Sequence, residues 1–157
     1  MAGVKLNTKG LDAAIRTLKG GGMGRLPKVR VGILASTNHR AGTGESNATI
    51  GAIHEFGNST HPMRSFLRMP LRTRLDKQLK KSGAFDNKTF DQVIKEKSFT
   101  VYMKKVGQVA VATILKAFGT NGFGTWAPWK GTYKSRTGDI LVDTAALRNS
   151  ITFEVKE

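Results

Sequence analysis

The sequence predicts an α+β fold in a single domain spanning residues 1–157, with a small, mostly antiparallel β-sheet packed against two long helices. Three observations lead to this prediction. Short runs of alternating apolar and polar residues lie toward both ends of the chain. Two long stretches between them carry apolar residues at helical spacing. Many of the 18 glycines fall between these segments, which predicts long Gly-rich loops.

The N-terminal segment predicts a short strand at residues 4–6 and then a helix, for which Asn7 or Thr8 can provide the N-cap. Three glycines at residues 20–22 end this helix. Its apolar residues share one face: Leu11, Ala14, Ile15 and Leu18.

Residues 29–34 have the clearest strand pattern in the first half, with Val29, Val31 and Ile33 on one face. Residues 35–47 follow, rich in Gly, Ser, Thr and Asn. So long a loop in a compact domain is usually functional or disordered. We expect it to be mobile in the free protein and to become ordered on a partner.

The centre of the chain predicts a short helix within residues 49–57, with Ile50, Ile53 and Phe56 forming its apolar face. Gly57 can end this helix because glycine adopts left-handed conformations at little steric cost. Pro62 then favours an extended turn.

The next stretch predicts a helix, because four leucines spaced four residues apart would form a stripe along one side. This helix is strongly basic. These leucines are Leu67, Leu71, Leu75 and Leu79. The other sides are cationic, and Asp76 is the only acidic residue among them.

Residues 88–118 predict a second helical region, interrupted near Ser98, with a broad apolar face that suits a central position against the sheet. A second Gly-rich segment, residues 119–131, is expected to be mobile. Asp143 or Thr144 can then cap a short helix that runs through Leu147.

The last element is a strand at residues 151–155, where Ile151, Phe153 and Val155 alternate with polar residues. We expect it to join residues 29–34 in one sheet.

The net charge is +15, from 26 Lys and Arg against 11 Asp and Glu. This exceeds the charge of roughly 2–8 that keeps a small domain soluble, so a polyanion such as nucleic acid is the expected partner. The absence of cysteine excludes disulfides and zinc–thiolate sites. No apolar run is long enough for a signal peptide or a membrane span, which predicts a soluble protein without membrane contact, made in the cytoplasm.

The sequence offers no convincing catalytic or cofactor site. His54, Glu55 and His61 do not have the spacing of zinc-protease ligands, so we expect no metal, and His54 is interpreted as a packing or hydrogen-bonding residue. No nucleophile elbow and no phosphate-binding loop occurs. The protein is therefore predicted to be a non-enzyme without a cofactor.

The basic helix is the main candidate interface, since cations along one helix can contact phosphates without reading sequence. The alternative interpretation is an ordinary solvated helix face. The candidate polyanion contacts are Arg64, Arg68, Arg72, Arg74, Lys77, Lys80 and Lys81.

Aromatic and basic residues also alternate after the second Gly-rich segment. Trp126, Trp129 and Tyr133 lie among Lys130 and Lys134, a mixture that could stack on bases. We favour the alternative that these tryptophans fix the loop to the core or to a neighbouring subunit.

Two stretches of the sequence form recognisable motifs. The first is AIHEFG (52–57), a short polar loop and PMRSFL (62–67). The second is the Trp-x-Pro of residues 126–128 with Thr132, Arg136 and ILVDTAALRNSI (140–151). Together they resemble a family of tailed-phage neck proteins, also called tail-completion, tail-component or virion-morphogenesis proteins. The motif residues taken as structural or interface positions are His54, Glu55, Phe56, Gly57, Pro62, Phe66, Trp126, Pro128, Trp129, Asp143, Thr144, Leu147 and Ser150.

Two positions depart from the family's pattern. Ala145 replaces the usual Gly after Asp-Thr, so we expect that this turn need not be left-handed. Ser65 replaces the Pro of the usual Arg-Pro-Phe, so we expect a less rigid loop before the basic helix.

The resemblance implies a structural virion protein, assembled in the host bacterial cytoplasm, that forms a six- or twelve-fold homo-oligomeric ring at the head–tail junction. Its implied partners are connector, tail-terminator and tail-tube proteins, with non-specific contact to packaged double-stranded DNA. Loops 35–47 and 119–131 would then become ordered on neighbouring rings. The alternative is a small basic DNA- or RNA-binding protein outside a virion.

Overall fold

The computed structural model describes residues 27–39, 44–84, 86–128, 140–141 and 145–156. The predicted strand at 4–6 and helix over 11–18 lie outside these residues, as do Trp129, Tyr133, Asp143 and Thr144. The chain has an α+β fold, as predicted, with five helices and a two-stranded antiparallel sheet among the described residues.

The sheet pairs two strands from distant parts of the chain, β1 (Lys28–Ile33) and β2 (Ile151–Lys156). They are antiparallel, and Val31 lies opposite Phe153. Both strands therefore form where the alternating patterns predicted them and pair as expected.

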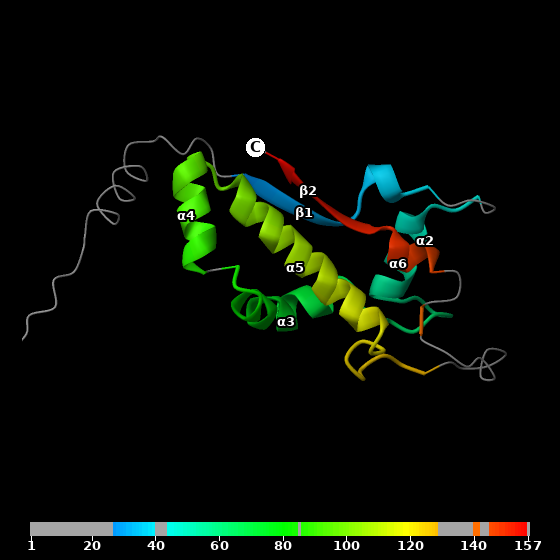
Figure 1. Cartoon of the computed structure of the whole chain (residues 1–157). Coiled ribbons are helices and arrows are strands. Elements are labelled where there is room, and N and C mark those ends of the chain that lie inside the picture. The colour runs from blue at the N-terminus through cyan, green and yellow to red at the C-terminus, as the bar shows by residue number, and fades with distance from the viewer. Residues whose placement is uncertain (1–26, 40–43, 85, 129–139, 142–144, 157) are drawn as a thin grey trace, which may run out of the picture.

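Helix α5 (Thr100–Phe118) is the central element (Figure 1). The sheet lies along one side of it and α3 (Arg68–Lys81) along the other. Helix α4 (Asn87–Glu96) packs against one end of α5, and α2 (Asn47–Phe56) and α6 (Ala146–Asn149) lie together at the other. The expected packing of two long helices on the sheet is not confirmed, because α5 contacts both strands whereas α3 packs against α5.

The break predicted near Ser98 separates α4 from α5. Asp86 caps α4 by accepting a hydrogen bond from Thr89 N at 2.8 Å. Lys97 ends α4 in the left-handed conformation, with φ at 50°. This residue turns the chain so that α4 and α5 meet at their apolar sides.

The core lies where α5, α3 and the C-terminal elements meet. Its buried residues are Phe66, Ile114, Ala117, Phe118, Trp126, Ile140, Leu141, Leu147 and Ile151. Leu67 and Leu71 pack against its edge, which is the inner side of the predicted leucine stripe.

The predicted apolar face of α2 is wrong. Asn47, Gly51 and Glu55 are its buried residues, whereas Phe56 is 61% exposed. Gly51 lets α2 approach β1 closely, since a Cβ there would lie 2.7 Å from Cδ1 of Ile33. Asn47 Nδ2 donates to the carbonyls of Thr37 and His39, both at 3.0 Å. Hydrogen bonding and close approach, rather than apolar spacing, therefore set the orientation of α2.

Residues 119–125 form a succession of hydrogen-bonded turns that leads into Trp126. Gly122 N donates to Ala117 O at 2.7 Å, and the Trp126 ring is buried against Phe118, with centroids 5.8 Å apart. This part of the segment expected to be mobile is therefore held on the core, as the interpretation of Trp126 as a fixing residue predicts.

Candidate functional site

The first motif stretch is organised around Glu55, a buried carboxylate in the last turn of α2. Its oxygens accept hydrogen bonds from Ser65 Oγ at 2.7 Å, from Leu67 N at 2.9 Å and from Arg68 N at 3.0 Å. Two of these donors are backbone groups at the start of α3. Glu55 therefore binds the N-terminus of α3, where the helix dipole favours a negative charge.

The backbone N–H groups in the first turn of α3 all have hydrogen-bond acceptors, apart from Pro70, which has no N–H. A helix normally leaves four N–H groups without an internal partner. Here Glu55 accepts from Leu67 and Arg68, while Ser65 Oγ accepts from Met69 N at 3.0 Å.

Ser65 links the loop before α3 to both helices. Its hydroxyl donates to Glu55 and accepts from Met69, so it joins the end of α2 to the start of α3. A proline at this position could make neither bond. We name Glu55, Ser65 and the first turn of α3 the α2–α3 junction.

Arg68 covers this junction from outside. Its Nε donates to Glu55 Oε1 at 3.0 Å, and its side chain is 59% exposed. Its guanidinium carbon lies 4.6 Å from the centroid of Phe56, which explains why an exposed phenylalanine is tolerated here.

Arg64 is not an exposed polyanion contact, which corrects the sequence-based prediction. It is 3% exposed, with Nε donating to Ala127 O at 3.0 Å and Nη2 donating to Pro128 O at 3.2 Å. Burial lowers the pKa of Arg64 from its usual value. Nearby, Trp126 Nε1 donates to Ser65 O at 3.3 Å. The first motif stretch is thus bound directly to the Trp-x-Pro of the second.

The other residues of the first stretch shape its turn. Gly57 has φ at 71°, and a Cβ there would lie 2.8 Å from Met63 N. Pro62 follows a turn in which Asn58 Oδ1 accepts from His61 N at 2.7 Å. Phe66 is buried against Phe118, with ring centroids 5.2 Å apart.

His54 lies half-buried beside Arg64 and His61. Burial, followed by the charge of Arg64 and then that of His61, lowers its pKa from 6.5 to about 4. Its ring is in an edge contact with His61, with centroids 6.1 Å apart. Among the described residues, no group of three His, Asp or Glu side chains is placed to hold a metal ion.

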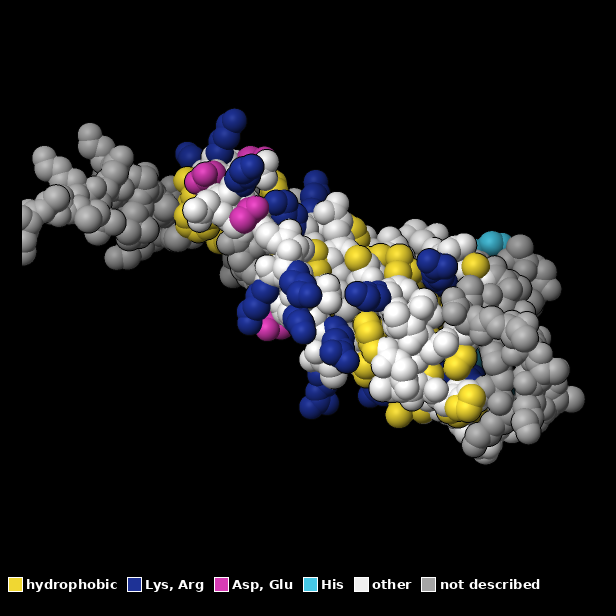
Figure 2. Space-filling view, turned by 60° about the horizontal axis from the view of Figure 1, so that its bottom comes forward, with side chains coloured by type: hydrophobic (Ala, Val, Ile, Leu, Met, Phe, Trp, Pro, Cys, Tyr) yellow, Lys and Arg dark blue, Asp and Glu magenta, His cyan; other side chains and the backbone are white. Residues whose placement is uncertain are grey.

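The remaining predicted cations form an exposed face on α3, which we name the α3 cationic face: Arg72, Arg74, Lys77, Lys80 and Lys81. Figure 2 shows Lys and Arg side chains gathered on this side of the molecule. Lys80 is paired with Asp76 at 2.8 Å, and the Arg74 guanidinium lies 5.1 Å from the Phe123 ring. The face therefore combines paired cations with side chains open to solvent.

A groove between α3 and α5, of about 310 Å³, adjoins this face. Its cationic residues are Lys81 and Lys116, and Gln78 and Thr113 also line it. The sequence-based prediction omitted Lys116 because it considered cations on one helix alone. The signal for it was the position of Lys116 outside the apolar face of the helix now seen as α5.

In the second motif stretch, Ser150 ties α6 to the rest of the fold. Its Oγ donates to Leu147 O at 2.7 Å, and its carbonyl accepts from Thr37 Oγ1 at 2.7 Å. Leu147 is buried in the core. Ala145, just before α6, has φ at 55°, so this turn is left-handed although alanine replaces the glycine of the family's pattern.

Comparisons with protein-family models, with curated proteins and with solved structures found no match to this chain. Within the described part of the chain, every helix is too short or too polar to cross a membrane.

Proposed function

We propose that this chain is a structural virion protein of a tailed phage, a subunit of a ring at the head–tail junction. The observation that carries the proposal is the contact between its two motif stretches. Arg64 in the first stretch donates to Ala127 and Pro128 in the second, although more than sixty residues separate them in the sequence. Both stretches that resemble the neck family thus form one structural unit.

The proposed role of this unit is to hold α3 in a fixed orientation. The α2–α3 junction satisfies the start of the helix, and Arg64 and Trp126 brace the loop before it. A cationic face held in this way can present the same charges from every subunit of a ring. Repetition then multiplies individually weak phosphate contacts along the DNA path.

In this proposal the protein is a non-enzyme that assembles in the bacterial cytoplasm and remains in the virion. Its partners are other copies of itself and the connector, tail-terminator and tail-tube proteins, with the α3 cationic face turned toward packaged DNA. The resemblance supports the neighbours, and the exposed cations support the DNA contact.

The test disables the gene in the phage that carries it and examines the particles by electron microscopy. The expected result is filled heads beside separate tails, with joining restored by the wild-type gene. Normal infectious virions without the gene would overturn the proposal.

A charge-reversal variant tests the DNA contact separately. Arg72→Glu, Arg74→Glu and Lys77→Glu together should reduce DNA retention in assembled particles. The matched control places the same charge change on exposed lysines outside α3: Lys88→Glu, Lys95→Glu and Lys104→Glu. Equal DNA retention in particles of the two triple variants would refute the proposed contact between the α3 cationic face and DNA.

The second candidate is a basic nucleic-acid-binding protein outside a virion, favoured by the groove that adds Lys116 to the α3 cationic face. It differs in one measurable respect. Such a protein should bind DNA strongly as an isolated chain, whereas a neck subunit should bind weakly until it assembles.

A further inference from the structure

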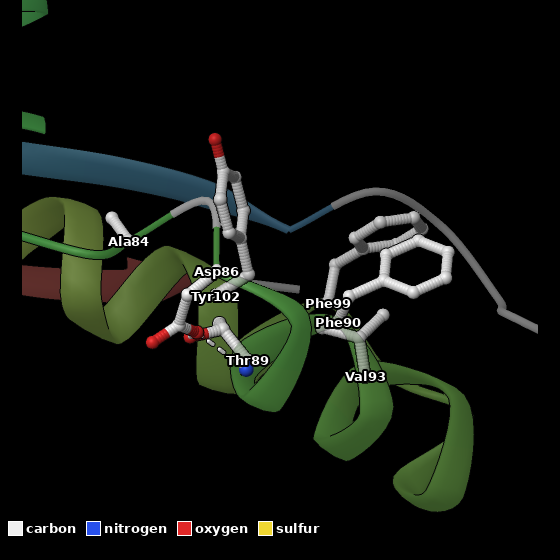
Figure 3. Close-up of a pocket in the computed structure, with 7 residues that line it drawn as sticks. All are labelled: Ala84, Asp86, Thr89, Phe90, Val93, Phe99 and Tyr102. Atoms are coloured by element: carbon white, nitrogen blue, oxygen red, sulfur yellow. Dashed lines mark hydrogen bonds between the residues drawn. The ribbon is translucent and has the colours of Figure 1, made fainter. Parts of the chain in front are cut away.

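A second groove, unrelated to the motif stretches, lies between α4 and α5. Its volume is about 330 Å³, and its walls are mainly apolar. Figure 3 shows Phe90 and Phe99 side by side at one end of it and Tyr102 and Ala84 toward the other. We name it the α4–α5 groove; its lining is Ala84, Asp86, Thr89, Phe90, Val93, Phe99 and Tyr102.

The groove leaves apolar surface exposed. Thr89 and Val93 are buried between the helices, but Phe90 is 46% exposed and is one of three large hydrophobic residues exposed in the described part of the chain. Phe56, another of the three, is covered by Arg68. Among the described residues, the cations found over aromatic rings lie over Phe56 and Phe123 and not over Phe90, so the Phe90 ring is available to an apolar partner.

The sequence contains a suitable partner. Residues 8–18 carry Leu11, Ala14, Ile15 and Leu18 at helical spacing, which predicts an apolar stripe. We propose that this segment of the same chain docks through that stripe into the α4–α5 groove.

The connection is long enough for this docking. β1 begins beside the end of α5 that carries α4, close to Phe90 and Phe99 (Figures 1 and 3). Nine residues, four of them glycine, separate Leu18 from Lys28. A flexible linker of that length has a root-mean-square span of about 16 Å. That matches the length of α4, a ten-residue helix of about 15 Å.

The short linker also favours the same chain over a second copy. An intramolecular partner on such a linker has an effective concentration in the millimolar range, far above that of free subunits in solution.

Hydrogen exchange on the full chain tests the docking. Residues 8–18 should exchange at least roughly tenfold more slowly than unstructured peptide, and Phe90→Asp should abolish that protection. Gln92→Asp, on an exposed position of the same helix, is the matched control and should leave it intact. Protection of β1 and β2 reports that each variant remains folded. No protection of residues 8–18, or equal protection in both variants, would overturn the proposal.

A disulfide test distinguishes the occupant, because the natural chain has no cysteine. Ala14→Cys with Ile94→Cys places thiols on the apolar stripe and beside the groove. Mild oxidation of dilute protein should give an intramolecular disulfide. Arg16→Cys with Ile94→Cys, from the polar side of the segment, should react at least roughly tenfold more slowly. Linked dimers as the main product would overturn docking within one chain, as would equal rates for the two pairs.

Discussion

Glu55 is one carboxylate on which the positions of two helices depend. From the last turn of α2, its two oxygens accept hydrogen bonds from Ser65, from the backbone at the start of α3 and from the Arg68 side chain. A buried carboxylate with several donors is difficult to replace, because each substitution leaves backbone N–H groups without an acceptor.

We predict that Glu55→Ala lowers the free energy of unfolding by about 3 kcal/mol, the typical effect of removing one partner of a buried charged pair. Glu55→Gln should lower it by about 2 kcal/mol, since an amide can replace only part of the acceptor capacity. Urea denaturation measures both. Glu96→Gln on an exposed site of α4 is the control, and a Glu55 variant as stable as that control would refute the role of the α2–α3 junction.

Ala145 occupies a conformation that alanine disfavours. Left-handed geometry costs a residue with a Cβ about 1 kcal/mol or more relative to glycine. We therefore predict that Ala145→Gly raises the free energy of unfolding by about 0.5–1 kcal/mol, after the greater flexibility of glycine in the unfolded chain is allowed for.

The neighbouring residue supplies the opposite control for this prediction. Ala146 begins α6 in the right-handed region, so Ala146→Gly should destabilise the protein by up to about 1 kcal/mol. Thermal or urea unfolding of the two variants should thus move in opposite directions. Shifts of the same sign would contradict the left-handed assignment.

His54 predicts a dependence of stability on pH. Its pKa is about 4 in the folded protein and 6.5 when unperturbed, so between these values the unfolded chain binds the additional proton. The contribution of His54 to the free energy of unfolding is therefore complete above pH 6.5 and is lost as the pH falls toward 4. His54→Gln should flatten the pH dependence of urea denaturation in this window, whereas His39→Gln, at an exposed site, should not.

At the scale of elements, the fold depends on how closely α5 approaches β2. Gly107 in the middle of α5 faces the Phe153 ring, and a Cβ at this position would overlap that ring. Glycine usually weakens a helix interior, so its presence here indicates that contact with the sheet decides the residue.

We predict that Gly107→Ala destabilises the protein by about 1–3 kcal/mol through overpacking, despite the gain in helix propensity of about 1 kcal/mol. Gln108→Ala, on the exposed side of the same helix, should change stability by less than about 0.5 kcal/mol. Denaturation midpoints compare the two. A stabilised Gly107→Ala variant would mean that α5 and β2 are farther apart than described.

At the scale of the whole molecule, the net charge of +15 is not evenly available to a polyanion. Arg64 is buried, Arg68 is bound to Glu55, and Lys80 is paired with Asp76. The α3 cationic face and its bordering groove are therefore one exposed cationic surface, and Lys88, Lys95 and Lys104 expose further cations on α4 and α5.

This distribution predicts how DNA binding varies with salt. If the five residues of the α3 cationic face contact phosphates, the slope of log K against log salt should be about −4.5. The triple reversal at Arg72, Arg74 and Lys77 should reduce its magnitude by about 3, and the triple reversal outside α3 by much less. Fluorescence anisotropy with duplex DNA measures both slopes. Equal slopes would mean that binding depends on net charge alone.

Apolar periodicity was sufficient to predict β1 and β2, because each strand buries one face of its own sequence. It also indicated that the helical region over α4 and α5 is interrupted. It failed for α2, where Asn47, Gly51 and Glu55 are buried for hydrogen bonding and close approach. It also failed for Arg64 and Ser65. Charge alone does not reveal that an arginine binds carbonyls sixty residues away, and a serine in a loop does not reveal which helix end it caps.

The pairing of β1 with β2 has a consequence for the order of folding during synthesis. More than a hundred residues separate the two strands, so β2 is synthesised well after β1. At an elongation rate of about 20 residues per second, β1 waits at least about 6 s for its partner. During that time its backbone donors and acceptors are an open strand edge, the kind of surface that chaperones bind and that promotes aggregation. Refolding of the finished chain and folding on the ribosome should therefore follow different routes to the same sheet.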